Sequence, residues 1–218
     1  MKPQAGASEG ALRVLFLAAE AEPLIKVGGL GDVAGSLPKA LNQLNPEGIQ
    51  GRQLDVRVVL PLHPGIRKKC GDQLERIATV NVPHGLGVIP AHIDRIVFSD
   101  TPYYLVSGEP VPEEGPVYSL DAGEDGRKFT FTSLAALELA RHLDWRPDIL
   151  HANDWHTAMA VYALTNLYAD DPFFKNTRSV LTVHNLPFLG VGAESALEEF
   201  GLPASQAEGL PEWARGMP

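Results

Sequence analysis

The stretch Lys26-Val27-Gly28-Gly29-Leu30-Gly31-Asp32-Val33 lies directly between an apolar run, residues 14–19, and a segment with helical periodicity. A glycine-rich turn that joins a strand to a helix is a common phosphate-binding site in α/β proteins. Glycine places no Cβ atom between a ligand and the backbone N–H groups at the positive end of the helix. The pattern is neither the Walker motif nor Gly-x-Gly-x-x-Gly, so spacing alone predicts an anion site without naming the anion.

The composition indicates a globular α/β protein of one large domain or two small ones. The chain has 218 residues, of which 44% are hydrophobic, and this is ample for a core. A formal net charge of −9 argues against nucleic acid or an anionic membrane as a general partner, because both bind basic surfaces. The single cysteine, Cys70, excludes an internal disulfide and fits a reducing compartment.

The N-terminal residues 1–10 are expected to form a flexible leader. Arg13 opens the apolar run that follows, and Glu20 and Glu22 close it, a pattern that favours a buried strand over a secretory signal. No run of the sequence approaches the ~18 apolar residues that a membrane helix needs. We therefore expect a soluble, cytoplasmic protein without a membrane partner.

The distribution of apolar residues predicts a doubly wound, Rossmann-like α/β fold. Near-continuous apolar strands are typical of a parallel sheet covered on both faces, and helical patterns separate the main runs. The predicted strands of the mostly parallel sheet are residues 13–19, 55–60, 149–152 and 180–183. The predicted helices are residues 33–44, 126–142 and 157–168.

Two further regions depart from this pattern. Shorter β-like pieces are predicted to form hairpins that extend or decorate the sheet, at residues 77–82, 88–92, 95–98 and 103–106. Residues 107–125 are rich in Gly, Pro and Glu and lack periodicity, so they are predicted to form a long loop, of the kind that often serves as a lid or is disordered.

Three polar segments, residues 26–32, 151–156 and 184–186, each follow a predicted strand. Because ligands of open parallel sheets bind at the carboxyl ends of the strands, these segments are expected to converge on one crevice. Simpler interpretations remain open for single residues. Lys26 can be a solvated loop lysine, Asp32 and Asp154 can cap the helices that follow, and His184 can be a buried histidine with both nitrogens satisfied. His151, Asp154 and His156 lack a recognised metal-site spacing, so no metal site is predicted.

Four ordered segments resemble one enzyme family. Residues 15–20 with Pro23 and the glycine-rich turn are similar to the N-terminal signature of bacterial glycogen synthases and plant starch synthases, glycosyltransferase family 5. The resemblance continues through residues 55–61, 146–158 and 182–190. Four matches in order along most of the chain make the resemblance specific.

The resemblance implies a two-domain glycosyltransferase of the GT-B architecture. Such an enzyme transfers glucose from ADP-glucose, or in some members UDP-glucose, to an α-1,4-glucan acceptor with retention of configuration and without a cofactor. Residues 11–218 correspond to the N-terminal, acceptor-side domain, truncated near its C-terminal end and without the second GT-B domain, so this fragment is expected to be inactive. The alternatives are another GT-B transferase, of the sucrose- or trehalose-forming type, and a non-catalytic carbohydrate-binding half-domain.

The resemblance also assigns roles to residues of the three polar segments. Lys26, Gly28 and Gly29 are expected to face the phosphates of the donor. His184 and Asp154 are the expected catalytic pair, which positions sugar hydroxyls and stabilises positive charge. The other expected substrate-binding residues are Asp32, Tyr118, His156 and Asn185.

The chain departs from the family pattern at a few positions. The family often has His-Ala-His-Asp-Trp-His where this chain has Asn at position 153. Asn can donate and accept hydrogen bonds but cannot become a cation. An Asp-Asn pair of the family appears as Glu124-Asp125, and an Arg as Lys128. These changes concern loop details more than the class of reaction.

Overall fold

The computed structural model describes residues 10–49, 51–193 and 195–202. In this part of the chain, seven strands form one sheet in the order β3-β4-β5-β2-β1-β6-β7. The predicted leader lies outside the described residues except for Gly10. The strands are β1 (Leu12–Leu17), β2 (Leu54–Pro61), β3 (Glu75–His84), β4 (Gly87–Phe98), β5 (Thr101–Ser107), β6 (Ile149–Asn153) and β7 (Arg178–Thr182).

The centre of the sheet is parallel and has the Rossmann strand order. Strand β1 pairs in parallel with β2 and β6, β2 pairs in parallel with β5, and β6 pairs in parallel with β7. The antiparallel pairs are β3 with β4 and β4 with β5, at one edge of the sheet. After β1 and β2, the chain crosses to the edge of the sheet at β3 and returns through β4 to β5, which lies beside β2. It then adds β6 and β7 on the other side of β1. The strand order therefore reverses between β1 and β6, where open α/β sheets bind ligands.

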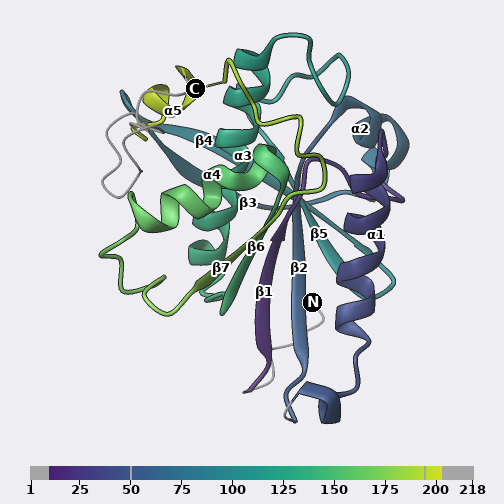
Figure 1. Cartoon of the computed structure of the whole chain (residues 1–218). Helices are drawn as coiled ribbons and strands as arrows, with labels where there is room; N and C mark the ends of the chain where they lie inside the picture. Colours follow the sequence, from purple (N-terminus) through teal and green to yellow (C-terminus); the bar gives the residue numbers. More distant parts are fainter. Residues whose placement is uncertain (1–9, 50, 194, 203–218) are drawn as a thin grey trace.

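Helices cover both faces of this sheet, as Figure 1 shows, with α3 and α4 on one side and α1 and α2 on the other. Alternate side chains of β1 serve the two cores, since Leu15 and Leu17 pack with α3 and α4 whereas Val14 and Phe16 pack with α1 and α2. This double burial explains the continuous apolar runs. The helices are α1 (Gly29–Asn42), α2 (Pro64–Cys70), α3 (Ala122–His142), α4 (Asp154–Thr165) and α5 (Ser195–Glu199), with short 3-10 helices at Pro46–Ile49 and Gly71–Gln73.

The predicted α/β fold is confirmed, and the four main strands agree with the prediction to within two residues at each end. The three predicted helices exist, but each begins three or four residues earlier than its periodicity indicates. Their first turns carry Gly, Asp and other polar residues, which have no apolar periodicity to detect. Helix α2 was not predicted at all.

The prediction of two separate strands at 88–92 and 95–98 is wrong. They form the single strand β4, which passes through Asp94 without interruption. Asp94 is buried, and its carboxylate accepts a hydrogen bond of 2.7 Å from Arg76 Nε on the neighbouring strand β3. A charge at a central strand position is tolerated here because it is paired across the ladder. The hairpin formed by β3 and β4 extends the sheet as expected. The loop predicted at residues 107–125 is shorter in the structure, where it covers residues 108–121.

Helix α1 lies unusually close to the turn that follows β1. A Cβ atom added to Gly35 would lie 2.2 Å from the Glu22 backbone oxygen. We therefore expect Gly35→Ala to lower the free energy of unfolding by at least about 2 kcal/mol, because backbone must move to relieve the overlap. Urea unfolding measures the change. Gly71→Ala is the matched control, since its added Cβ meets nothing within 4 Å, and an equal loss of stability in both variants would contradict the close approach.

Candidate functional site

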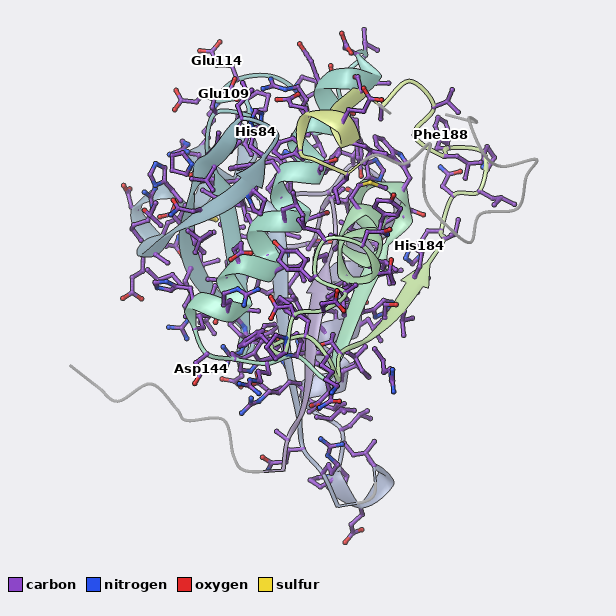
Figure 2. The ribbon with its side chains drawn as sticks, turned by 90° about the vertical axis from the view of Figure 1, so that its left-hand side faces the viewer. His84, Glu109, Glu114, Asp144, His184 and Phe188 are labelled. Carbon is purple, nitrogen blue, oxygen red and sulfur yellow. The ribbon has the colours of Figure 1, made fainter. Side chains whose placement is uncertain are left out.

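The three polar segments predicted to converge do so. They surround one cavity of about 860 Å³ at the carboxyl ends of β1, β6 and β7. Figure 2 shows His184 at the end of β7 and Phe188 in the loop beyond it, on the opposite side of the molecule from Glu109 and Glu114. The predicted site residues in the cavity lining are Gly28, Gly29, Tyr118, Asp154, His156, His184 and Asn185.

The glycine-rich turn contributes the positive end of helix α1 to the cavity. Gly28 is the N-cap residue, and the helix begins at Gly29. The first N–H groups of a helix have no hydrogen-bond partner within the helix. Those of Gly29 and Leu30 lie at the end of α1 that lines the cavity. This geometry favours an anion, as the sequence predicts.

A buried carboxylate, Glu20, holds the glycine-rich turn in place. It is 2% exposed and accepts hydrogen bonds from the backbone N–H groups of Val27 and Gly28. The Tyr118 hydroxyl donates to the same carboxylate at 3.0 Å. Glu20 therefore joins the turn to the 108–121 loop, and the N–H groups left for a ligand begin at Gly29. Sequence reasoning did not assign this role, although an acidic residue at the end of a buried strand was the available signal.

Lys26 and Asp32 lie outside the lining of the large cavity. Lys26 Nζ donates to Asp32 Oδ1 at 2.6 Å and lies 3.8 Å from Glu22 Oε2. This hydrogen bond to Asp32 is the main cause that raises the pKa of Lys26 above its ordinary value. Asp32 does not cap α1, so that interpretation is wrong: it lies in the first turn, after the Gly28 N-cap. Asp32 instead borders a smaller cavity of about 420 Å³ with Lys39 and Tyr103.

Asp154 joins the end of β6 to the segment after β7. Its Oδ1 atom accepts hydrogen bonds from the backbone N–H groups of His184, at 2.6 Å, and Asn185, at 3.2 Å. The capping interpretation is wrong here too, because Asn153 is the N-cap residue of α4. Asp154 has a φ of 58°, which is uncommon for a residue other than glycine and is typical of strained positions in functional sites.

His156 lies in a cluster of aromatic rings on the cavity wall. Its ring centroid is 4.9 Å from that of Tyr118, 4.6 Å from that of Phe129 and 4.4 Å from that of Trp155. Burial lowers the pKa of His156 to about 4, so the ring is neutral at pH 7. Burial also raises the pKa of Tyr118, with the Glu20 charge as a second cause. The wall therefore presents a neutral, mostly aromatic surface.

The predicted absence of a metal site concerned His151, Asp154 and His156. His151 bonds to Thr182 Oγ1 at 2.8 Å and takes no part in the cavity lining. Within the described ranges, no group of three His, Cys, Asp or Glu residues is placed to hold a metal ion. In the same ranges, no helix combines the length and apolar character needed to cross a bilayer.

A family model described as "Starch synthase catalytic domain" matches residues 13–215. The chain belongs to this family. Members similar to it include the glycogen synthases of Clostridium perfringens, 37% identical over 193 residues, and of a Bacillus cereus strain, 37% identical over 185 residues. These alignments cover 86% and 83% of this chain but only 37% and 36% of the relatives, so the chain spans little more than a third of their length.

Among solved structures, this starch synthase family chain is similar to the catalytic domain of starch synthase IV from Arabidopsis thaliana, a structure described as bound to ADP and acarbose. The TM-score is 0.73 at 29% sequence identity, and the match covers 88% of this chain and 38% of the other. The family and the GT-B resemblance expected from the four motifs are thereby confirmed.

A substitution of Glu20 tests whether this carboxylate holds the glycine-rich turn. Replacing it with Gln leaves one acceptor oxygen where two now receive the Val27 and Gly28 N–H groups and the Tyr118 hydroxyl. We expect Glu20→Gln to lower the free energy of unfolding by about 1–3 kcal/mol, because a buried donor loses its partner. Tyr118→Phe removes one hydrogen bond only and should cost about 1 kcal/mol. If urea unfolding shows the Gln variant to be no less stable than the Phe variant, the described role of Glu20 is wrong.

The buried histidines supply a test against pH. Burial lowers the pKa values of His63 and His156 to about 4, whereas an unfolded histidine titrates near 6.5. Between pH 4 and 6.5 the unfolded chain binds more protons at these histidines than the folded chain does. Their contribution to the free energy of unfolding is therefore fully present above pH 6.5 and is lost as the pH drops towards 4. Each histidine should contribute a slope of about 1 kcal/mol per pH unit. Urea unfolding from pH 4.5 to 7.5 should show a smaller slope for His156→Phe than for the wild type.

The matched control for that substitution is His142→Phe, at an exposed position near the end of α3. A His156→Phe variant with the full wild-type slope would show that His156 is not neutralised by burial.

Proposed function

We propose that this chain forms the acceptor-side domain of a retaining glucosyltransferase that elongates an α-1,4-glucan from ADP-glucose. The observation that carries the proposal is the single cavity at the β1/β6 reversal, which joins a helix N-terminus to the polar groups of His184, Asn185 and Asp154. Family membership supports this reaction class, and the ADP and acarbose of the Arabidopsis structure support the two kinds of ligand.

The two sides of the cavity suit different parts of a nucleotide sugar. The N–H groups of Gly29 and Leu30 and the positive end of α1 would meet the diphosphate, whose charge increases as the sugar leaves. Lys26 would join them after exchanging its contact with Asp32 for a phosphate oxygen. Such an exchange costs little free energy, because water screens an exposed ion pair and weakens its net attraction.

The sugar would lie near the segment that follows β7. His184 is exposed to the cavity, and Asp154 fixes its backbone and that of Asn185 through Oδ1. Asp154 Oδ2 accepts no hydrogen bond from the described residues, so it is placed to receive a sugar hydroxyl and to stabilise positive charge that develops at the ring. In this proposal, transfer occurs on the face from which the diphosphate departs, with no covalent intermediate on either residue.

Residues 11–218 would supply one wall of the active site, and a second GT-B domain would supply the other. The 37% coverage of the Clostridium relative supports this division. The proposal includes a cytoplasmic location, which the lone, buried Cys70 fits. Transfer needs both walls, because a site between domains takes its affinity and its charge stabilisation from both.

Binding measurements on this chain test the proposal. Isothermal titration with ADP should show weak binding that Lys26→Ala reduces by about tenfold, because one charge-assisted hydrogen bond to the phosphates is lost. Lys39→Ala is the matched control, because Lys39 is an exposed lysine in the last turn of α1, at the opposite end of that helix from the N–H groups that line the large cavity. Equal ADP affinity of the two variants would contradict the phosphate role of Lys26.

An activity assay tests the division into two walls. With labelled ADP-glucose and glycogen, this chain alone should incorporate no label, and steady incorporation would overturn the division. Binding of a maltooligosaccharide without any binding of ADP would favour a non-catalytic carbohydrate-binding module instead.

A further inference from the structure

Asn153 is the fully buried link between the centre of the sheet and His184. It is the last residue of β6 and has an exposed fraction of 0%. Its side-chain amide connects the ends of β6, β1 and β7. The Nδ2 atom donates to the Leu17 backbone oxygen of β1 at 2.8 Å, and the Oδ1 atom lies 2.9 Å from Nε2 of His184, just after β7. This is the position at which the chain departs from the family's usual histidine.

The two contacts determine which way the amide points. The Leu17 oxygen is a carbonyl and can only accept, so the amide group that faces it must be the NH2. The oxygen of the amide therefore faces His184. Because an amide oxygen can only accept, Nε2 of His184 must carry the proton. A neutral imidazole has one N–H, and Nδ1 is then left as a bare acceptor.

We propose that Asn153 is a positioning residue that holds neutral His184 as its Nε2–H tautomer and so makes Nδ1 a hydrogen-bond acceptor for a ligand hydroxyl. His184 lines the large cavity, and its Nδ1 has no hydrogen-bond partner among the described residues. Asp154 fixes the backbone of the same residue through a hydrogen bond of 2.6 Å. The ring and its backbone are thus each held by one of two consecutive residues, Asn153 and Asp154.

The tautomer decides which part of a ligand His184 can recognise. A bare Nδ1 accepts from a hydroxyl, which a sugar offers in several positions, but a diphosphate at neutral pH offers no donor. This division matches the opposite character of the α1 end, where N–H groups donate to anions. The identification of the hydroxyl as that of a sugar rests on the proposed function; the tautomer itself does not.

The amide also suits the task better than an ionisable group. A histidine at position 153 could face His184 with a nitrogen that either donates or accepts, depending on its tautomer, whereas the amide oxygen is an acceptor at every pH. Asn153 consequently continues to accept from His184 Nε2 over the whole working range. The substitution at this family position thus has a physical consequence, a constant acceptor behind the imidazole.

Nitrogen NMR of this chain tests the proposal without any ligand. The chain, labelled with 15N in its histidine rings, is studied by long-range proton–nitrogen correlation at pH about 9, where histidine side chains are neutral. The His184 signals are assigned as the set that His184→Gln removes. We expect one tautomer, protonated at Nε2, with an N–H proton that exchanges slowly with water. A proton on Nδ1, or averaging between the two nitrogens, would overturn the proposal.

Variants of Asn153 separate tautomer control from a general structural role. Asn153→Ala removes the acceptor, so the His184 nitrogens should move to averaged positions and the slow N–H exchange should be lost. Asn153→Asp keeps an oxygen towards the ring and should retain the Nε2–H pattern, although it loses the hydrogen bond to the Leu17 oxygen and should lower the free energy of unfolding. An Ala variant that folds with unchanged His184 nitrogens would overturn the proposal. If the Ala variant does not fold, the His184 tautomer observed in the wild type and in the Asp variant decides whether the proposal holds.

Asn42→Ala is the matched control. Asn42 is also an asparagine whose amide bridges backbone groups, donating to the Val56 oxygen at 3.1 Å and accepting from the Val56 N–H at 2.8 Å. Its loss should destabilise the chain without affecting the His184 nitrogens. Since the experiment uses neither nucleotide nor turnover, it can fail while the proposed transferase function stands, and the binding assays can fail while the tautomer assignment stands.

Discussion

The parallel pairing of β1 with both β2 and β6 is the constraint on which the rest of the structure depends. A strand with parallel neighbours on both sides needs helices on both faces, and this requirement accounts for the two separate cores. At the carboxyl ends of β1 and β6 the chain leaves the sheet towards opposite faces, since α1 follows β1 on one face and α4 follows β6 on the other. The cavity lies at that separation, so the fold alone decides where the site is.

Acidic side chains of the protein, rather than basic ones, organise this cavity. Glu20 holds the glycine-rich turn, and Asp154 holds the segment after β7. Both accept from backbone N–H groups, which are satisfied when buried only if such a partner is present. An acidic protein with a net charge of −9 needs a local positive point to receive an anion, and the N-terminus of α1 offers one. In the proposed function, neutral sugar groups would lie near Asp154 and phosphate near the first N–H groups of α1.

The features that the sequence predicted are those that leave a local pattern, and the features that it missed depend on contacts between residues far apart in the chain. The apolar runs and the three polar strand ends predicted the sheet and the convergence of its loops, because double burial and strand order leave a direct pattern in the sequence. The helix starts were placed too late, since first turns such as Gly29 to Asp32 have polar residues that serve the site instead of the core. The contacts of Glu20 with Tyr118 and of Asn153 with His184 join residues 98 and 31 positions apart, and no local pattern encodes such pairs. The capping roles suggested for Asp32 and Asp154 are wrong because the carboxylates have other partners, Lys26 for Asp32 and the backbone after β7 for Asp154.

The central claim is that segments far apart in the sequence form one binding surface at the β1/β6 reversal. Amide hydrogen exchange of this chain, with and without a saturating concentration of ADP-glucose, tests it most directly. The account predicts slower exchange in ADP-glucose both at Gly29 and Leu30 and at His184 and Asn185, with no change in the β4–β5 turn at Ser99 and Asp100, which borders the smaller cavity. Protection confined to the β4–β5 turn, or to only one of the two segments of the large cavity, would contradict it.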